Sequence, residues 1–171
     1  MRMLLHACCC SCFSSVFEQI GGSYDLTVYF CNPNIKPDKE YARRLEELKN
    51  YPPSMGIKIV EGTRNFIELP YGPEGGERCR VCIGYRLNEV AKYSKENGFD
   101  IFATTLTVSP HKNSEMINGL GQVLSRKYGV EYLLSNFKKK NGYLRTVELS
   151  KQYGLYRQNY CGCTPKEIHP S

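Results

Sequence analysis

The chain has 171 residues, with 23 Lys and Arg against 17 Asp and Glu, and therefore a formal net charge of +6. Its length suits one compact domain, so we expect residues 1–171 to fold as a single domain. It contains no apolar run long enough to cross a bilayer and no secretory signal, which excludes an integral membrane protein and predicts a cytoplasmic protein with reduced thiols.

Short segments rich in β-branched and aromatic residues alternate along the chain with longer segments of helical apolar spacing. In chain order they predict strand 2–6, helix 13–20, strand 26–30, helix 38–49, strand 57–60, helix 80–97, strand 101–108, helix 114–128, strand 131–134 and helix 146–153. This alternation is typical of an α/β fold with a mostly parallel sheet and helices on both faces. Sites in such sheets lie beyond the carboxyl ends of the strands, where residues 7–12 and 109–111 are expected to meet.

Nine cysteines are the most informative feature of the sequence, and eight of them fall into three short clusters. The clusters are Cys8, Cys9, Cys10 and Cys12; Cys79 and Cys82; and Cys161 and Cys163. Thiols this close in sequence are poorly placed for pairwise disulfides but well placed to bind a metal ion or an iron–sulfur cluster. The remaining cysteine, Cys31, ends a predicted strand and is expected to be a small core residue.

The first cluster lies between the first strand and the first helix, where nucleotide-binding proteins place glycines that approach phosphate groups. Residues 6–12 contain no glycine, so chemistry that uses ATP is not expected. A helix N-terminus favours thiolates for the same reason that it favours phosphate. We therefore expect some of Cys8, Cys9 and Cys12 to coordinate a metal ion, and His6 to satisfy a hydrogen bond near this loop.

The second and third clusters are spaced as pairs of metal ligands. Cys79 and Cys82 form a Cys-x-x-Cys motif near a predicted helix start, and Cys161 and Cys163 flank a glycine that lets the backbone fold around a cluster. Four thiolates match either a four-iron, four-sulfur (4Fe-4S) cluster or a structural zinc ion. Their spacing does not decide between the two, although a purely structural site would not need a third group of thiols.

The motifs of the chain resemble those of the QueH-type epoxyqueuosine reductases along nearly its whole length. The matching segments are Leu5 to Cys9 with Cys12, Tyr29 and Phe30 with Asn32 to Ile35 and Glu40-Tyr41, Glu77 to Cys79 with Cys82 and Arg86-Leu87, Thr104 to Leu106 with Ser109-Pro110, and Tyr156 to Cys163. The last of these segments is highly specific, whereas the Cys-x-x-Cys motif alone is not.

This resemblance implies an oxidoreductase that acts on transfer RNA in the cytoplasm. It would reduce the epoxide of epoxyqueuosine at the wobble position to the cyclopentene of queuosine, with a 4Fe-4S cluster, an adjacent metal ion expected to be iron, an unidentified electron donor and no cobalamin. The implied fold is an α/β sandwich similar to the nucleotide α-hydrolase (HUP-like) group. The resemblance assigns Cys79, Cys82, Cys161 and Cys163 to the cluster, and Cys8, Cys9 and Cys12 to the catalytic metal ion.

Two departures from the family pattern fall in the first cysteine cluster. Cys10 and Ser11 stand where such proteins often have Ala and Pro, and Cys12 stands where some relatives have an acidic residue. A cysteine at position 12 keeps an anionic ligand but makes it softer. A thiol at position 10 could compete for metal, so the division of cysteines between the two centres is open.

The basic residues are unevenly spread, and Lys138, Lys139 and Lys140 are consecutive. They form either a solvated loop or a patch that contacts phosphate groups. If the partner is tRNA, we expect phosphate contacts from Lys138, Lys139, Lys140, Arg145 and Arg157. Three side chains are candidate proton donors for the epoxide, namely His111, Tyr156 and Tyr160.

Two other functions are compatible with the sequence. A zinc-stabilised RNA-binding domain would use the same four thiols without catalysis. A cluster-dependent tRNA sulfurtransferase would have a similar fold, but such enzymes activate the base with ATP. The absence of glycine from residues 6–12 argues against the phosphate loop that this second alternative needs.

Overall fold

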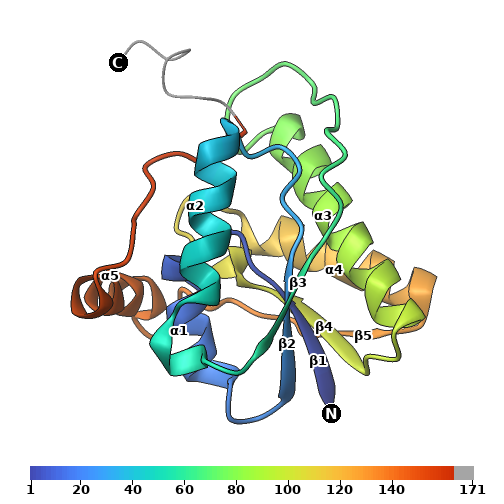
Figure 1. The fold of residues 1–171 in the computed structure, drawn as a ribbon. Helices are drawn as coiled ribbons and strands as arrows, with labels where there is room; N and C mark the ends of the chain where they lie inside the picture. Colours follow the sequence, from blue (N-terminus) through green and yellow to red (C-terminus); the bar gives the residue numbers. More distant parts are fainter. Residues whose placement is uncertain (164–171) are drawn as a thin grey trace.

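The structure is a computed structural model that describes residues 1–163, and a five-stranded sheet forms its middle layer (Figure 1). The strands are β1 (Arg2–His6), β2 (Asp25–Phe30), β3 (Lys58–Glu61), β4 (Ile101–Thr104) and β5 (Glu131–Tyr132). Their order across the sheet is β3-β2-β1-β4-β5, and every neighbouring pair is parallel. The predicted α/β fold is confirmed, with a wholly parallel sheet in the described part of the chain.

Helices cover both faces of this sheet. Within residues 1–163 they are α1 (Cys10–Ile20), α2 (Asp38–Lys49), α3 (Glu77–Glu96), α4 (Ser114–Tyr128) and α5 (Gly142–Tyr153), with short 3-10 helices η1 (Pro52–Ser54) and η2 (Thr105–Val108). Helices α1, α2 and α5 lie on one face, and α3 and α4 lie on the other (Figure 1). None of these described helices has the length and apolar character that crossing a membrane requires.

The central strand β1 shows why the sequence forms two cores. Met3, Leu4 and Leu5 are all 0% exposed, because a parallel sheet is covered on both faces. Met3 and Leu5 pack in the core beneath α1 and α2, whereas Leu4 packs in the core beneath α3 and α4. This alternation follows from the two-residue period of a strand.

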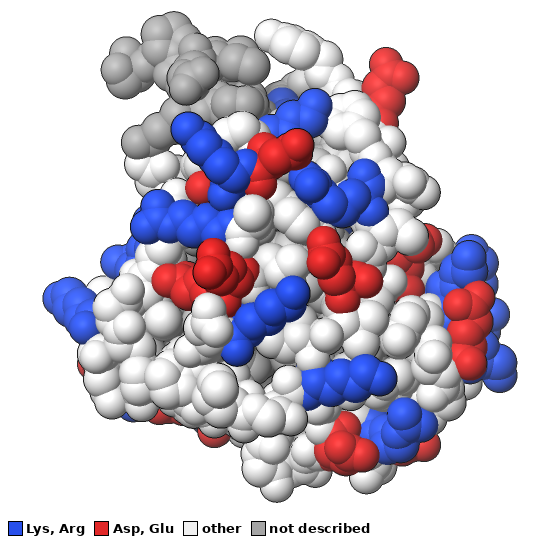
Figure 2. Space-filling model, viewed as in Figure 1, with Lys and Arg blue, Asp and Glu red and all other residues white. Residues whose placement is uncertain are grey.

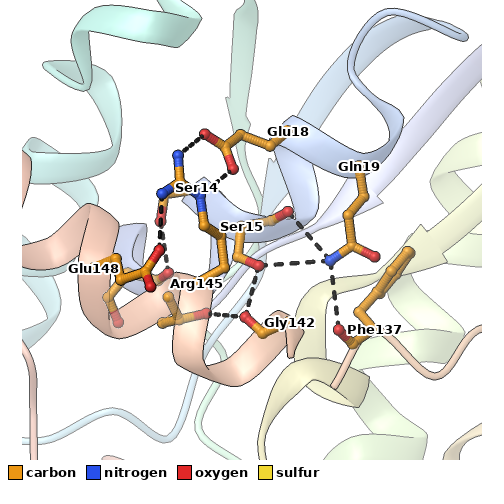
Figure 3. Close-up of polar contacts among 10 residues, drawn as sticks. Ser14, Ser15, Glu18, Gln19, Phe137, Gly142, Arg145 and Glu148 are labelled. Carbon is orange, nitrogen blue, oxygen red and sulfur yellow. Dashed lines mark hydrogen bonds and ion pairs between the residues drawn. The ribbon is translucent and has the colours of Figure 1, made fainter. Parts of the chain in front are cut away.

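Helix α5 packs against α1 through polar contacts as well as apolar ones (Figure 3). Ser15 Oγ donates a hydrogen bond to Gly142 O at 2.8 Å, and Gln19 Nε2 donates to Phe137 O at 3.4 Å. These contacts hold α5 and the segment before it against α1, so α1 and α5 share one layer although they are far apart in the sequence.

Three helices begin earlier than predicted. Helix α1 starts at Cys10 rather than at residue 13, α3 at Glu77 rather than at residue 80, and α5 at Gly142 rather than at residue 146. The N-cap residues of α1 and α3 are Cys9 and Gly76, and neither makes a side-chain capping hydrogen bond. The usual Ser, Thr, Asp or Asn signal is therefore missing. Two cysteines of the first cluster and both of the second consequently lie on helices.

The predicted strand 101–108 is wrong in its second half, because β4 ends at Thr104 and the next four residues form η2. Thr104 Oγ1 accepts a hydrogen bond from Leu106 N at 3.2 Å. Such a local bond offers the backbone an alternative to the sheet ladder. At the sheet edges, β3 is shifted by one residue from its predicted range and β5 ends at Tyr132 rather than at residue 134.

The carboxyl ends of β1 and β4 lie side by side, with His6 opposite Thr104. The chain continues from β1 to β2 and β3 on one side, and from β4 to β5 on the other. Connections that leave in opposite directions open a crevice between the two strand ends. The fold therefore places a crevice directly after β1, where the first cysteine cluster begins.

Candidate functional site

The second and third cysteine clusters meet in a small cavity at this edge of the sheet. Its lining includes Cys79, Cys82, Cys161, Cys163, Arg86 and Lys112. All nine cysteines of the chain are free thiols. The structure thus brings together four cysteines that come from the middle and from the C-terminal part of the chain.

Helical spacing explains how α3 contributes to this cavity. Cys79, Cys82 and Arg86 are three and four residues apart, so they lie on one face of the helix. The two cysteines are buried, at 6% and 5% exposed. Gly75 N donates a hydrogen bond to Cys79 Sγ at 3.1 Å and so orients this thiol.

The C-terminal cysteine pair lies on irregular backbone, which α2 holds in place. Arg44 Nη1 donates to Cys161 O at 3.0 Å, and Arg44 Nη2 donates to Tyr160 O at 3.2 Å. Arg44 is buried and forms an ion pair with Glu40 at 2.7 Å. A buried guanidinium therefore anchors the segment that presents the third cysteine cluster.

Gly162 allows the same segment to approach the loop after β2. Its φ is +116°, and a Cβ at this position would lie 2.8 Å from Ile35 Cγ1. Gly162 O accepts a hydrogen bond from Lys36 N at 2.8 Å, and Tyr160 Oη donates to Lys36 O at 2.7 Å. The glycine between the two cysteines is thus required by both backbone conformation and space.

In the first cluster, Cys8, Cys9 and Cys12 lie together beside the small cavity. Cys8 Sγ lies 4.0 Å from Cys9 Sγ. The pKa of the Cys9 thiol is well below its usual value, because the Cys12 and Cys8 side chains hydrogen-bond to its sulfur. Cys8, Cys12 and Cys161 line a second cavity of about 560 Å³. Because Cys161 also lines the small cavity, all three clusters meet at adjoining cavities.

Cys10 and Cys31 lie apart from both cavities, since each is 0% exposed and packs in a hydrophobic core. Burial raises the pKa of the Cys10 thiol, and it raises the pKa of Cys31 to about 12. The core position predicted for Cys31 is confirmed. Cys10 packs with Phe13 and Val16 of α1 rather than beside the other thiols of its cluster.

Two buried cations line the small cavity beside the four cysteines. Although burial by itself would lower it, the pKa of Arg86 is raised by the electrostatic attraction of Cys82 and Cys161. Lys112 is also buried, and its Nζ pairs with Glu74 Oε1 at 2.7 Å. A cavity with cations on its wall suits an anionic occupant.

His6 has the structural role that its position predicted. Its Nδ1 lies 3.0 Å from Thr104 Oγ1, and its Nε2 lies 3.2 Å from both Asn32 Oδ1 and Cys31 O. Burial and the nearby Arg86 charge lower the pKa of His6 to about 3. The imidazole is therefore neutral near pH 7 and joins the ends of β1, β2 and β4 below the cavities.

The donor set fits a 4Fe-4S cluster in kind and number, because four cysteines supply the four thiolates that such a cluster takes. Arg86 also has two buried nitrogens, Nε and Nη2, without a hydrogen-bond partner. The space between these groups is about 10 Å³, room for about one water molecule. No three Cys, His, Asp or Glu side chains within residues 1–163 are already arranged around one metal ion.

The larger cavity has a polar wall and a volume typical of a ligand pocket. Its lining includes Ser11, Glu74, His111, Lys112, Gln158 and Tyr160. Of the candidate proton donors, His111 and Tyr160 lie on this wall, whereas Tyr156 Oη donates to Glu40 Oε2 at 3.1 Å. Gln158 Oε1 is buried without a partner, so this cavity offers an unused acceptor beside the first cysteine cluster.

Five residues that line the two cavities are not predicted as site residues from the sequence: Glu74, Lys112, Gln158, Arg44 and Arg86. The two arginines occupy apolar faces of their helices, since Arg44 lies between Tyr41 and Leu48 and Arg86 lies beside Leu87. An arginine within an apolar stripe is the signal that could have found them, because such charges are rarely buried without a partner.

Three of the five residues predicted to contact phosphate have intramolecular partners, and one of them is Arg157, whose Nη2 donates to Tyr143 Oη at 3.2 Å. Lys138 Nζ donates to two backbone carbonyl oxygens at 2.7 and 3.3 Å. Arg145 pairs with both oxygens of Glu18 at 2.7 Å and with Glu148 at 2.9 Å (Figure 3). Their charged groups are therefore already held by the protein.

Lys139, Lys140 and Arg157 are the more accessible residues of that set. Lys139 and Lys140 are exposed and line a shallow groove of about 570 Å³, while Arg157 is exposed at the larger cavity. On the face shown in Figure 2, basic and acidic side chains are intermixed. The net positive charge does not form one uninterrupted patch on that face.

Comparisons with known proteins identify the family to which the chain belongs. A family model described as epoxyqueuosine reductase QueH matches residues 3–167. The chain is similar to the epoxyqueuosine reductase QueH of Streptococcus pyogenes serotype M1, with 43% identity over 94% of this chain and 68% of the relative. The corresponding values are 38%, 95% and 74% for the Staphylococcus aureus protein of that name, and 35%, 94% and 88% for that of Thermotoga maritima. The chain therefore belongs to the QueH family of epoxyqueuosine reductases.

Proposed function

We propose that this chain reduces epoxyqueuosine in tRNA to queuosine. Two electrons and two protons break both carbon–oxygen bonds of the epoxide, which leaves an alkene in the cyclopentane ring and releases the oxygen as water. The observation that carries the proposal is the meeting of three cysteine-bearing segments of a QueH-family chain: six cysteines line two adjoining cavities, and Cys9 lies beside Cys8.

The cysteines divide between two centres in this proposal. Cys79, Cys82, Cys161 and Cys163 hold a 4Fe-4S cluster, and Cys8, Cys9 and Cys12 hold an adjacent iron ion. When bound, the cluster would supply electrons one at a time and the ion would serve as a Lewis acid for the epoxide oxygen. The shared lining residue Cys161 supports this arrangement, because it makes the two cavities direct neighbours.

The remaining wall of the larger cavity binds the nucleoside and supplies a proton. We assign proton donation to His111, because the Tyr160 hydroxyl is already used by Lys36 O and Tyr156 is paired with Glu40. Histidine is the commonest general acid in enzymes. The unpartnered Gln158 Oε1 would accept a hydrogen bond from a hydroxyl group of the cyclopentane ring.

Transfer RNA would present its wobble nucleotide unstacked, because a base in a loop is read by edge and stacking contacts. The cavity of about 560 Å³ has room for such a nucleoside. Phosphate contacts would come from Lys139 and Lys140, and from Lys138, Arg145 and Arg157 once their intramolecular contacts are exchanged. The proposed enzyme is a single HUP-like domain in the cytoplasm that uses neither ATP nor cobalamin.

Anaerobic purification followed by turnover tests this proposal. Iron, sulfide and zinc are measured per chain, and the protein is mixed with tRNA that carries epoxyqueuosine and with a low-potential one-electron donor such as reduced viologen. Mass spectrometry of the released nucleosides should show queuosine, without ATP or cobalamin in the reaction. Iron-loaded protein that leaves epoxyqueuosine unchanged would contradict the proposal.

A zinc-stabilised RNA-binding domain is the second candidate function, and one observation favours it. The space of about 10 Å³ between the four thiols is closer to the size of a single ion than to that of a cluster. Four thiolates also form a common structural zinc site. A colourless protein with one zinc ion per chain, tRNA binding and no reductase activity would support this candidate over the reductase.

A further inference from the structure

We propose that Arg86 is the buried counter-charge of the sulfur centre and that it raises the reduction potential of the bound cluster. This role rests on the proposed function, since it concerns the same cofactor. Arg86 lines the small cavity but supplies no sulfur ligand, so its role would be to tune the potential of the cluster.

The first observation is the isolation of the Arg86 charge. The side chain is 1% exposed, and within residues 1–163 it forms no ion pair with a carboxylate. A buried guanidinium without an anionic partner is strongly unfavourable. Four cysteine side chains share its cavity, so anionic sulfur at these positions would compensate the charge.

The second observation is which donors of Arg86 are unused. Nη1 donates to Asn32 Oδ1 at 3.1 Å, whereas Nε and Nη2 are buried without a partner. Nε and Nη2 form one edge of the planar guanidinium, and this edge donates two parallel hydrogen bonds to an anion. The unused part of the side chain is thus its bidentate edge.

The orientation of Arg86 is fixed from the side of the sheet. Asn32 Nδ2 donates to Ala7 O at 2.9 Å, while Asn32 Oδ1 contacts both His6 Nε2 and Arg86 Nη1. The amide is therefore held at both ends and cannot turn to follow the guanidinium. This contact leaves the opposite edge of Arg86 for another partner.

Lys112 is the other buried cation of the cavity, and unlike Arg86 it has a carboxylate partner among the described residues. Its charge is balanced by Glu74 at 2.7 Å, so Arg86 contributes the unbalanced positive charge of the pair. Hydrogen bonds to sulfur and nearby positive charge favour the reduced, more negative state of an iron–sulfur cluster. Removal of the Arg86 charge should therefore lower the reduction potential.

Redox titration of anaerobically reconstituted protein tests this role. Cluster absorption and the electron paramagnetic resonance signal are followed in the wild type, Arg86→Gln and Arg86→Lys. Arg2→Gln is the control, because Arg2 begins β1 and the cysteine loop follows the other end of that strand. At a fixed potential, Arg86→Gln should lower the ratio of reduced to oxidised cluster about tenfold, which is 59 mV for a one-electron couple. Arg86→Lys keeps the charge without the bidentate edge, so its shift should be smaller. Arg2→Gln should match the wild type.

The possible outcomes separate this role from the function on which it rests. Wild-type protein that binds no iron–sulfur cluster overturns the proposed cofactor and the Arg86 role together. A loaded wild type with an unchanged potential in Arg86→Gln overturns the Arg86 role alone. If Arg86→Gln fails to hold a cluster, Arg86→Lys decides, because a cluster held by this charge-retaining variant supports the counter-charge role and loss of the cluster from it as well overturns that role.

Discussion

Cys9 and Cys10 are neighbours in the chain but pack in different cores, on opposite faces of the sheet. Cys9 is the N-cap of α1 with extended backbone (φ −164°, ψ 158°), and Cys10 is the first residue of the helix. This change of backbone conformation points the two side chains apart. Cys10 is therefore separated from Cys8 and Cys9, which pack together in the other core.

Alanine at each of these two positions should give opposite results. Cys9→Ala should abolish epoxyqueuosine reduction without unfolding the chain, because it removes a thiolate beside Cys8 and Cys12. Cys10→Ala should retain turnover within about twofold and lose about 1 kcal/mol of stability, as expected for a small cavity in a core. Nucleoside analysis and thermal unfolding measure the two effects. Full activity in Cys9→Ala would remove the proposed role of that loop.

Loss of the Arg44 side chain should release the C-terminal cysteine pair. Arg44→Met removes the hydrogen bonds to Cys161 O and Tyr160 O and leaves Glu40 buried without its cationic partner. Breaking such a buried pair costs about 3–5 kcal/mol. Denaturant unfolding should show this loss, and the iron bound per chain should fall by at least half.

The matched control for that variant is Lys49→Met on the same helix, at an exposed position. It should keep wild-type stability within about 0.5 kcal/mol, as is usual for surface substitutions. Equal iron content in all three proteins would show that Arg44 does not hold the cysteine segment.

Acid should destabilise the chain through His6. The pKa of His6 is about 3 in the folded protein, compared with about 6.5 for an unperturbed histidine. Between these values the unfolded chain binds the additional proton, so the free energy of unfolding falls as the pH falls, by up to about 1.4 kcal/mol per pH unit. Urea unfolding at pH 6.5 and pH 5 should show a weaker pH dependence in His6→Gln than in the wild type. The same dependence in both proteins would contradict a neutral buried His6.

Substitution of the two exposed lysines should weaken tRNA binding in a salt-dependent manner. A protein that loses two phosphate contacts should show a slope of log affinity against log salt that is smaller by about 1.5 to 2. We expect this result for the double variant Lys139→Ala with Lys140→Ala. Arg145→Ala is the comparison, and its effect should be smaller because Glu18 and Glu148 already hold that guanidinium. Filter binding of the anticodon stem-loop at several salt concentrations measures both, and an unchanged slope in the double variant would exclude these lysines as phosphate contacts.

The sequence correctly predicts the first and last residues of the helices that have local start and stop signals. Helix α4 follows Asn113, whose side chain accepts a hydrogen bond from Met116 N, and it ends at Gly129 in the left-handed conformation. Helix α2 begins after Pro37 and stops before the proline pair that starts η1. Caps and prolines act within a few residues, so they can be read without the tertiary structure.

The parts of the site that could not be predicted depend on contacts between distant segments. The burial of Arg86 requires Asn32 and the cysteines of the second and third clusters to be in place. The separation of Cys10 from its neighbours requires α1 to begin one residue after Cys9, without a capping side chain to mark that start. The start of α1 therefore leaves no local signal in the sequence, whereas Arg86 leaves only its position within an apolar helix face.

The anchoring of Cys161 by Arg44 has a consequence for the order in which the protein matures. Two of the four sulfur atoms around the small cavity belong to residues 161 and 163. Both residues follow Cys79, Cys82 and the five strands in the chain, so a ribosome synthesises them after the sheet that supports the other two thiols. The four thiols of the small cavity are thus complete only once residue 163 has been synthesised, later than all five strands of the described sheet.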